Sequence, residues 1–125
     1  MSSLDQRYRK GLRKVSATVS HVAAATPANQ YLLTAGRTCV IRKLIVRNRS
    51  GANVWVDIGT GLGVAFVRSG PSFYAINGTI NIWTEEEIPE VEFSANITAQ
   101  VSAAAAAPAD VEVTVEVEEY QGPTG

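Results

Sequence analysis

The side chains that could perform chemistry are few and widely spaced in this sequence of 125 residues. His21 is the only histidine, so a Ser-His-Asp or Cys-His centre would have to use it, yet it lies among serine, valine and alanine residues. Cys39 is the only cysteine and lies in the apolar run CVIRKLIV, which favours a small buried hydrophobic residue over a reactive thiol. We therefore predict no catalytic residue, no disulfide within the chain and no enzymatic function.

Two other stretches have the composition of a cofactor or metal site without its spacing. GTGLG (59–63) is glycine-rich, but it opens no predicted helix and has neither the GxGxxG nor the P-loop spacing. Glu85, Glu86, Glu87 and Glu90 offer carboxylates to a hard cation, but three consecutive carboxylates do not converge on one face. We expect a tight turn and a solvated loop at these places, with no cofactor and no metal.

A basic cluster near the N-terminus is the clearest candidate for binding. The stretch RYRKGLRK (7–14) contains five cations in eight residues, namely Arg7, Arg9, Lys10, Arg13 and Lys14. Such a cluster suits a phosphate backbone, an anionic membrane surface or an acidic protein surface, and a solvated tail is the plain alternative. We predict that it binds an acidic protein surface, such as the acidic half of a neighbouring subunit, and that any contact with nucleic acid is confined to this segment.

Charge is divided between the two halves of the sequence, although the net charge is only −1. Residues 1–68 carry all eleven basic side chains and two acidic ones, a balance of +9, whereas residues 69–125 carry ten acids and no base, a balance of −10. A division of this kind indicates interaction surfaces rather than a fold. It favours a homo-oligomer, with a trimer preferred, in which one copy's basic half meets another's acidic half.

Most of the chain reads as a series of short strands without a helical period. Strands are predicted at 37–49, 52–59, 63–70, 72–83, 91–101 and 111–120. Asn77-Gly78 between apolar flanks predicts a hairpin, and the last strand alternates valine with glutamate or threonine, as in an antiparallel sheet with one solvated face. The fold class is therefore all-β, with the strands arranged as an antiparallel β-sandwich or barrel.

This pattern divides the chain into three parts. Residues 1–28 form a basic N-terminal arm, extended or marginally helical and outside the core; residues 29–121 form the sandwich; residues 122–125 form a flexible tail. The basic stretch lacks a following apolar segment typical of a secretory signal, and no run reaches the ~20 apolar residues that span a membrane. We expect folding in a reducing cytoplasm and no membrane partner.

Two tryptophans are candidates for contact surfaces. Trp55 falls on the polar side of its predicted strand, and Trp83 ends the 72–83 segment. We expect core or subunit-interface aromatics here, and the alternative is a stacking platform for sugars or bases that also includes Phe73 and Tyr74.

Two segments resemble small structural proteins of tailed bacteriophages, of the capsid decoration (cement) or head-fibre-base type. They are LLTAGRTCVIRKLIVRNRSGANVWVDIGTG (32–61) and ITAQVSAAAAAPADVEVTVEVEEY (97–120), and the resemblance spans roughly residues 30–120. It implies a jelly-roll-like sandwich, often trimeric, that bridges capsomers through its sheets and an extended terminus. The implied partner is the major capsid protein, and the implied location is the capsid surface of a virion assembled in the host cytoplasm.

Two other classes of protein fit the same sequence. One is a jelly-roll capsid subunit whose basic arm binds the packaged genome. The other is a carbohydrate-binding tail or fibre module, which would depend on Trp55 and Trp83. Binding of the purified protein to empty capsids would separate the decoration protein from both.

Overall fold

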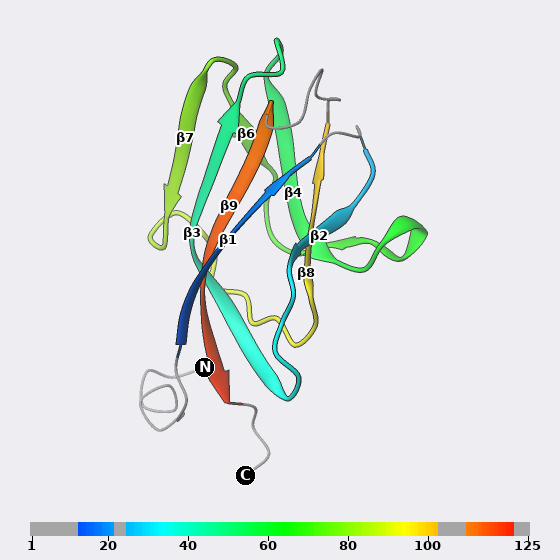
Figure 1. The fold of residues 1–125 in the computed structure, drawn as a ribbon, viewed down its shortest axis with the longest axis vertical. Helices are drawn as coiled ribbons and strands as arrows, with labels where there is room; N and C mark the ends of the chain where they lie inside the picture. Colours follow the sequence, from blue (N-terminus) through cyan, green and yellow to red (C-terminus); the bar gives the residue numbers. More distant parts are fainter. Residues whose placement is uncertain (1–12, 22–24, 103–109, 122–125) are drawn as a thin grey trace.

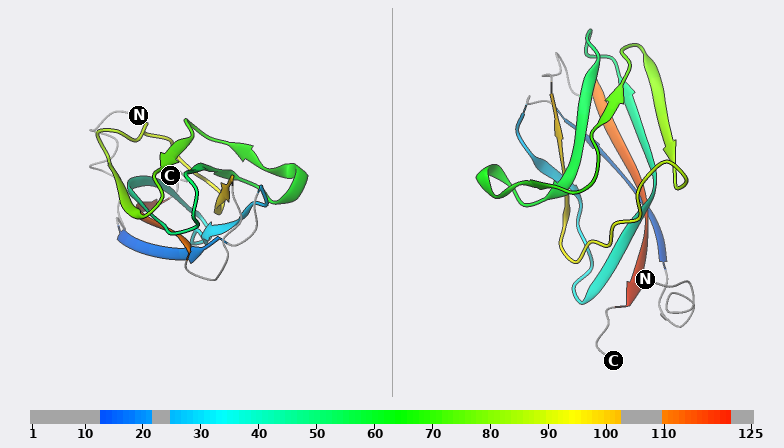
Figure 2. Two further views of the ribbon diagram at one scale, coloured as in Figure 1. Left: turned by 90° about the horizontal axis from the view of Figure 1, so that it is seen from above. Right: turned by 180° about the vertical axis from the view of Figure 1, so that it is seen from behind.

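The computed structural model describes residues 13–21, 25–102 and 110–121, and within them almost all regular structure is strand (Figure 1). The elements in chain order are β1 (Arg13–Ser20), β2 (Ala28–Tyr31), β3 (Arg37–Asn48), β4 (Val54–Thr60), the 3₁₀-helix η1 (Gly63–Ala65), β5 (Val67–Arg68), β6 (Phe73–Ala75), β7 (Thr79–Thr84), β8 (Ile97–Val101) and β9 (Val111–Gln121). They form two antiparallel sheets stacked face to face, which Figure 2 shows from above and from behind. The predicted all-β sandwich is confirmed.

The order of the strands is that of a jelly roll. Sheet A has the order β1-β9-β3-β7, and sheet B has the order β2-β8-β4, with β5 and β6 both paired to β4. If the two-residue β5 is set aside, the first strand pairs with the last, the second with the second-last, and so on to the middle. This nested pairing of eight strands across two sheets defines the jelly roll.

The core lies between the sheets and follows from residue alternation along the strands. Val111, Val113, Val115 and Val117 of β9 are buried, and the residues between them face outward, as the period of two predicted. Across the interface, β4 and β8 contribute a matching row of buried aliphatic side chains, namely Val54, Val56, Ile58, Ile97, Ala99 and Val101. Burial of these two rows is the main stabilising contribution to the fold.

The predicted hairpin at Asn77-Gly78 is wrong, although the turn itself is present. Gly78 has φ = +80°, as a tight turn requires, but β6 pairs with β4 in sheet B whereas β7 pairs with β3 in sheet A. The turn is therefore a crossover between the sheets. Two hydrogen bonds hold this turn against the segment before β4. The Asn77 amide donates to Asn53 Oδ1 at 2.8 Å, and the Gly51 amide donates to Asn77 Oδ1 at 2.9 Å.

The expected N-terminal arm, residues 1–28, also differs from what the structure describes. From Arg13 onward the chain forms β1, an edge strand of sheet A paired with β9 over its whole length. The physical reason is a period of two that we did not recognise: Val15 and Ala17 pack against the core, and the residues between them are exposed. Residues 1–12 and 122–125, which hold the rest of the predicted arm and the predicted tail, lie outside the described residues.

A buried glutamine joins β2 to the two strands that it faces in sheet A. The Gln30 side-chain amide donates to the carbonyls of Val113, at 2.7 Å, and Ala17, at 3.2 Å. The Gln30 Oε1 atom lies 2.8 Å from His21 Nε2. Because an amide oxygen can only accept, His21 Nε2 must carry the proton and donate it to Gln30 Oε1. His21 is thus a buried packing residue with a hydrogen-bond partner.

Two predicted strands are shorter than expected. Within 63–70 only Val67 and Arg68 form a strand, after the η1 turn, and within 91–101 the strand begins at Ile97. Phe93 instead makes an isolated bridge to Cys39. Within the described ranges, no helix is long and apolar enough to span a membrane.

Candidate interaction surfaces

The five basic residues predicted to bind a partner are only partly within the described structure. Arg7, Arg9 and Lys10 lie outside the described residues. Arg13 begins β1, and Lys14 is exposed on this strand in register with Glu118 of β9. Their role as a binding cluster stays a prediction.

The acidic and basic halves of the sequence meet within one chain, on the outer face of sheet A. The basic residues of β3 and the acidic residues of β9 are cross-strand neighbours: Lys43 is in register with Glu116, and Arg47 with Glu112. Arg47 Nη1 lies 3.2 Å from Glu112 Oε1. Opposite charges at such positions stabilise the pairing of the two strands. The division of charge therefore contributes to strand pairing within one chain, and it is no longer in itself a reason to expect oligomers.

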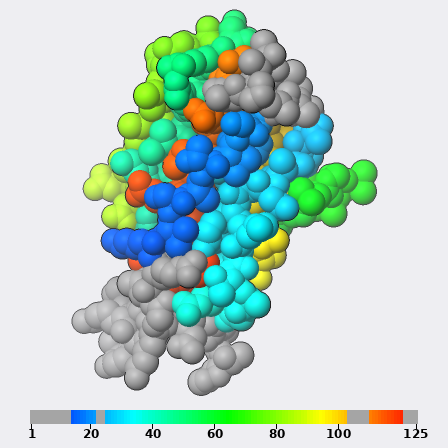
Figure 3. Space-filling view, viewed as in Figure 1, coloured from blue at the N-terminus to red at the C-terminus, as the bar shows by residue number. Residues whose placement is uncertain are grey.

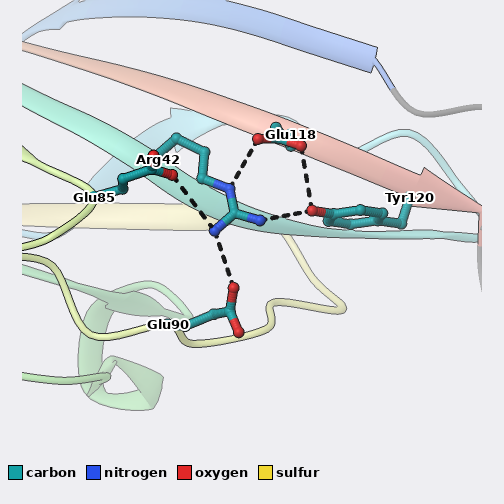
Figure 4. Close-up of polar contacts among 5 residues, drawn as sticks. All are labelled: Arg42, Glu85, Glu90, Glu118 and Tyr120. Carbon is teal, nitrogen blue, oxygen red and sulfur yellow. Dashed lines mark hydrogen bonds and ion pairs between the residues drawn. The ribbon is translucent and has the colours of Figure 1, made fainter. Parts of the chain in front are cut away.

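Arg42 is at the centre of this charge pairing (Figure 4). Its Nε lies 2.9 Å from Glu118 Oε1, and its Nη1 lies 2.9 Å from Glu90 Oε1 and 3.9 Å from Glu85 Oε2. Its Nη2 donates to the Tyr120 hydroxyl at 2.7 Å. The β3–β9 register shifts between Ile41 and Lys43, so that Arg42 occupies a β-bulge, which re-aims a side chain.

This network shifts the pKa of two of its members. Burial opposes the charged form of Arg42, but its hydrogen bonds to Tyr120 and Glu90 and the nearby charge of Glu118 outweigh burial and raise the pKa of the guanidinium. Burial also raises the pKa of Tyr120. Both groups thus keep their ordinary protonation states, and the cluster joins β3, β9 and the loop after β7 by fixed charges.

Three of the four carboxylates considered for a metal are used in other contacts. Glu85 and Glu90 face Arg42, and Glu87 Oε1 accepts from the Thr84 amide at 3.1 Å and lies 3.2 Å from its hydroxyl. In the part of the chain that the structure describes, no three carboxylate, histidine or cysteine side chains are grouped as a metal site.

Cys39 is fully buried, which confirms its assignment as a small core residue. Burial, together with the nearby charges of Glu119 and Glu92, raises the pKa of the thiol to about 12. A protonated and inaccessible thiol is unreactive at neutral pH.

The two predicted interface aromatics lie in different environments. Trp55 of β4 is 48% exposed on the outer face of sheet B, beside the 42% exposed Tyr74 of β6, with a ring-centroid distance of 4.6 Å. Trp83 is partly buried against the core and contacts Phe73 edge-on, with centroids 5.2 Å apart. The four aromatic residues therefore do not form one surface: Trp55 pairs with Tyr74 on the outer face of sheet B, and Trp83 pairs with the buried Phe73.

An apolar loop, defined here as residues 61–68, projects from the end of sheet B. It is the green segment that stands out from the body in Figure 3. Leu62 and Val67 are 49% and 64% exposed, and Val64 is fully exposed. The loop is nevertheless ordered by η1 and by pairing of Thr60 with Val67. The sequence signal was the run Gly61-Leu62-Gly63-Val64, in which glycine alternates with aliphatic residues and which we interpreted only as a turn and a strand.

The outer edge of sheet A carries a second apolar surface. On the edge strand β7, Ile80 and Ile82 are 62% and 51% exposed, and Ile82 is in register with the partly exposed Ile45 of β3. An exposed apolar edge strand is a common site of pairing with another chain.

The arrangement of strands is that of a jelly roll, and the similarity to known proteins lies in the fold rather than in the sequence. No protein-family model matches the sequence, and the curated proteins contain no match to it. The fold is similar to that of a chain from the disulfide-linked pili of Bacillus endospore appendages, with 16% identity, a TM-score of 0.50, and coverage of 89% of this chain and 88% of that chain. A chain of the cyanophage Pam1 capsid asymmetric unit has 18% identity, a TM-score of 0.40, and coverage of 90% and 86%. The likeness to the pilus chain shows a shared fold alone.

Proposed function

We propose that the chain is a non-catalytic structural subunit that attaches to the surface of a phage capsid, as a decoration or cement protein does. The observation that carries this proposal is the apolar loop. Its side chains Leu62, Val64 and Val67 are exposed to solvent, although the backbone of the loop is ordered. An ordered element that presents several aliphatic side chains together is characteristic of a protein–protein contact.

The loop suits insertion into a pocket of a partner subunit. Burial of an exposed aliphatic side chain contributes up to about 1.5–3 kcal/mol, so three side chains supply several kcal/mol at one contact. Because η1 and the β4–β5 pairing already hold the loop, little conformational entropy is lost when it binds. Weak contacts of this kind become firm retention when many copies bind one shell.

The capsid is proposed as the partner because of the sequence resemblance over roughly residues 30–120. The basic residues at 7–14 would add an anchor to an acidic coat surface. Nucleic acid is the less favoured partner, since Arg42, Lys43 and Arg47 on the outer face of sheet A already face acidic residues of β9 and leave little net positive charge for a phosphate backbone.

The experiment locates the chain in particles. Antibodies raised against the purified protein are applied to negatively stained particles from cultures of the source organism, with gold as the marker. We expect gold on capsid shells. Gold on tails or fibres only, or protein that never sediments with particles, would overturn the proposal.

A second experiment tests the loop itself. Particles stripped of the protein are mixed with the wild type or with the Leu62→Ser, Val64→Ser, Val67→Ser triple variant. We expect the variant to lose at least about tenfold in affinity, which corresponds to 1.4 kcal/mol. The matched control is Leu32→Ser, because Leu32 is 65% exposed but lies outside the loop; equal losses in both would contradict the role of the loop.

A further inference from the structure

An aromatic pair with polar neighbours lies on the outer face of sheet B, apart from the apolar loop. Trp55 and Tyr74 are directly opposite each other in the β4–β6 register. Both side chains face outward, because Val54, Val56 and Phe73 on either side of them are buried. The rings of Trp55 and Tyr74 are thus about half exposed to solvent, while their neighbours in sequence lie in the core.

Polar side chains next to this pair are held in place by hydrogen bonds. Asp57 lies two residues beyond Trp55 on the same face of β4, in register with Gln100 of β8. The Ser72 hydroxyl donates to Asp57 Oδ1, and Arg68 Nη1 donates to Ser72 Oγ at 2.9 Å. The carboxylate is therefore oriented by a chain of donors that begins at Arg68.

The tyrosine is also oriented. Asn53 Nδ2 donates to the Tyr74 hydroxyl at 3.0 Å, and Ser102 Oγ accepts from the Trp55 amide at 2.8 Å. The ring-centroid distance of 4.6 Å and the interplanar angle of 49° make the pair a shallow, tilted surface rather than a stacked one. Aromatic side chains bind the apolar part of a small ligand, and a few precisely placed polar groups fix its orientation.

We propose that this surface, formed by Trp55, Tyr74, Asp57 and Gln100, binds a neutral glycan. A pyranose ring has an apolar C–H face, which packs on an aromatic ring, and a rim of hydroxyl groups, which donate to a carboxylate and exchange hydrogen bonds with an amide. The surface offers both kinds of partner side by side.

The chemistry of the surface favours a glycan over two other ligands. A nucleic acid would bring phosphates close to Asp57, which repels them. The loop at 61–68 is better suited to a protein partner, since its exposed side chains Leu62, Val64 and Val67 are all aliphatic. This inference goes beyond attachment to a capsid: it gives the protein a second contact, toward a cell-surface or extracellular polysaccharide.

The test uses the full chain and named probes. The protein is applied to an array of glucose, galactose, mannose, rhamnose and N-acetylglucosamine oligosaccharides, and the best probe is then titrated by calorimetry and by tryptophan fluorescence. We expect a dissociation constant of about 1 mM or below for at least one probe. Binding should change the emission of the exposed Trp55, whereas Trp83 packs against the core.

Matched variants make the result specific. Trp55→Ala should weaken binding at least about tenfold and Asp57→Asn about threefold to tenfold, whereas Ile82→Ala, an equally exposed apolar site on sheet A, should have no effect. Circular dichroism confirms that each variant is folded. Failure of all probes to bind at up to about 10 mM, or unchanged binding by Trp55→Ala, would overturn the proposal.

Discussion

At the scale of single residues, Arg42 shows how a charged side chain can stabilise a sandwich from its outer face. Its side chain and that of Glu118 are only 21% and 16% exposed, so the pair is largely shielded from water. Shielded charges contribute when each has its partners and cost free energy when one partner is removed. Each member of the Arg42 network depends on the others.

We therefore predict that Arg42→Met lowers the free energy of unfolding by about 2 kcal/mol, because Glu118 and Tyr120 lose a charged donor while the aliphatic packing is kept. Urea denaturation measures the change. Arg49→Met is the control, since Arg49 is exposed, and it should change stability by less than about 0.5 kcal/mol. Equal effects of the two substitutions would show that the network does not stabilise the fold.

His21 gives a prediction with a defined sign. Burial lowers its pKa below the ordinary 6.5, and the hydrogen bond to Gln30 only partly opposes this shift. As the pH falls through about 6.5, the unfolded chain takes up a proton that the folded chain refuses, so stability declines. Above that pH both states are neutral at this residue and the effect vanishes.

We expect the stability of the wild type to fall more steeply between pH 7 and pH 5 than that of His21→Gln, as measured by thermal denaturation across that range. Carboxylates titrate equally in both proteins, so the difference between the two curves isolates His21. Parallel curves would contradict the assignment of a neutral buried histidine.

At the scale of elements, Gly61 makes the apolar loop possible. It has φ = +86°, and a Cβ atom at this position would lie 2.3 Å from the Ala65 carbonyl oxygen. Gly78, in the turn before β7, has a similar φ of +80° but nothing within 4 Å of the same position. Substitution of either glycine by alanine incurs the cost of a positive φ, but only the substitution at Gly61 adds steric overlap with the backbone.

We predict that Gly78→Ala costs about 1–2 kcal/mol, the penalty of the left-handed conformation alone. Gly61→Ala should lower the free energy of unfolding clearly more, or should displace η1, because its Cβ atom would also overlap the backbone of Ala65. Urea denaturation of the two variants gives the comparison. A smaller effect at Gly61 would mean that the loop relaxes freely and is not preorganised.

The sequence predicted elements well where the pattern was local and poorly where pairing was distant. Alternation in 111–120 predicted β9 and its buried face. Asn77-Gly78 predicted a turn, but the choice of partner for β7 depends on β3, which is far away in the sequence. The partnership of Trp55 and Tyr74 likewise depends on β4–β6 register, which local patterns do not contain. The exposed side of Trp55, by contrast, followed from its place in the alternation.

At the scale of the whole molecule, the structure changes the argument for self-association. Arg42 and Arg47 find their acidic partners within the chain, so charge no longer favours an oligomer. The exposed isoleucines of β7 now carry the proposal instead, because this edge of sheet A can be extended by a second chain. A homotrimer stays our preferred proposal.

The corresponding prediction concerns Ile80 and Ile82. If β7 is the contact between copies, the wild type should sediment as an oligomer and the Ile80→Lys, Ile82→Lys variant as a monomer, with unchanged circular dichroism. Leu32→Lys is the control, because Leu32 is as exposed but lies outside sheet A. A wild type that stays monomeric across a wide concentration range would restrict self-association to the assembled shell.

The pairing of the first strand with the last has a mechanical consequence. β1 and β9 run antiparallel, so the chain enters β1 at Arg13 directly beside Glu119, near the point where it leaves β9. A tensile load that separates these two ends breaks the hydrogen bonds between β1 and β9 one after another, and not all at once. Little force is needed to open such a ladder. If the protein bears load on a particle, the load must enter through its surface contacts rather than along its backbone.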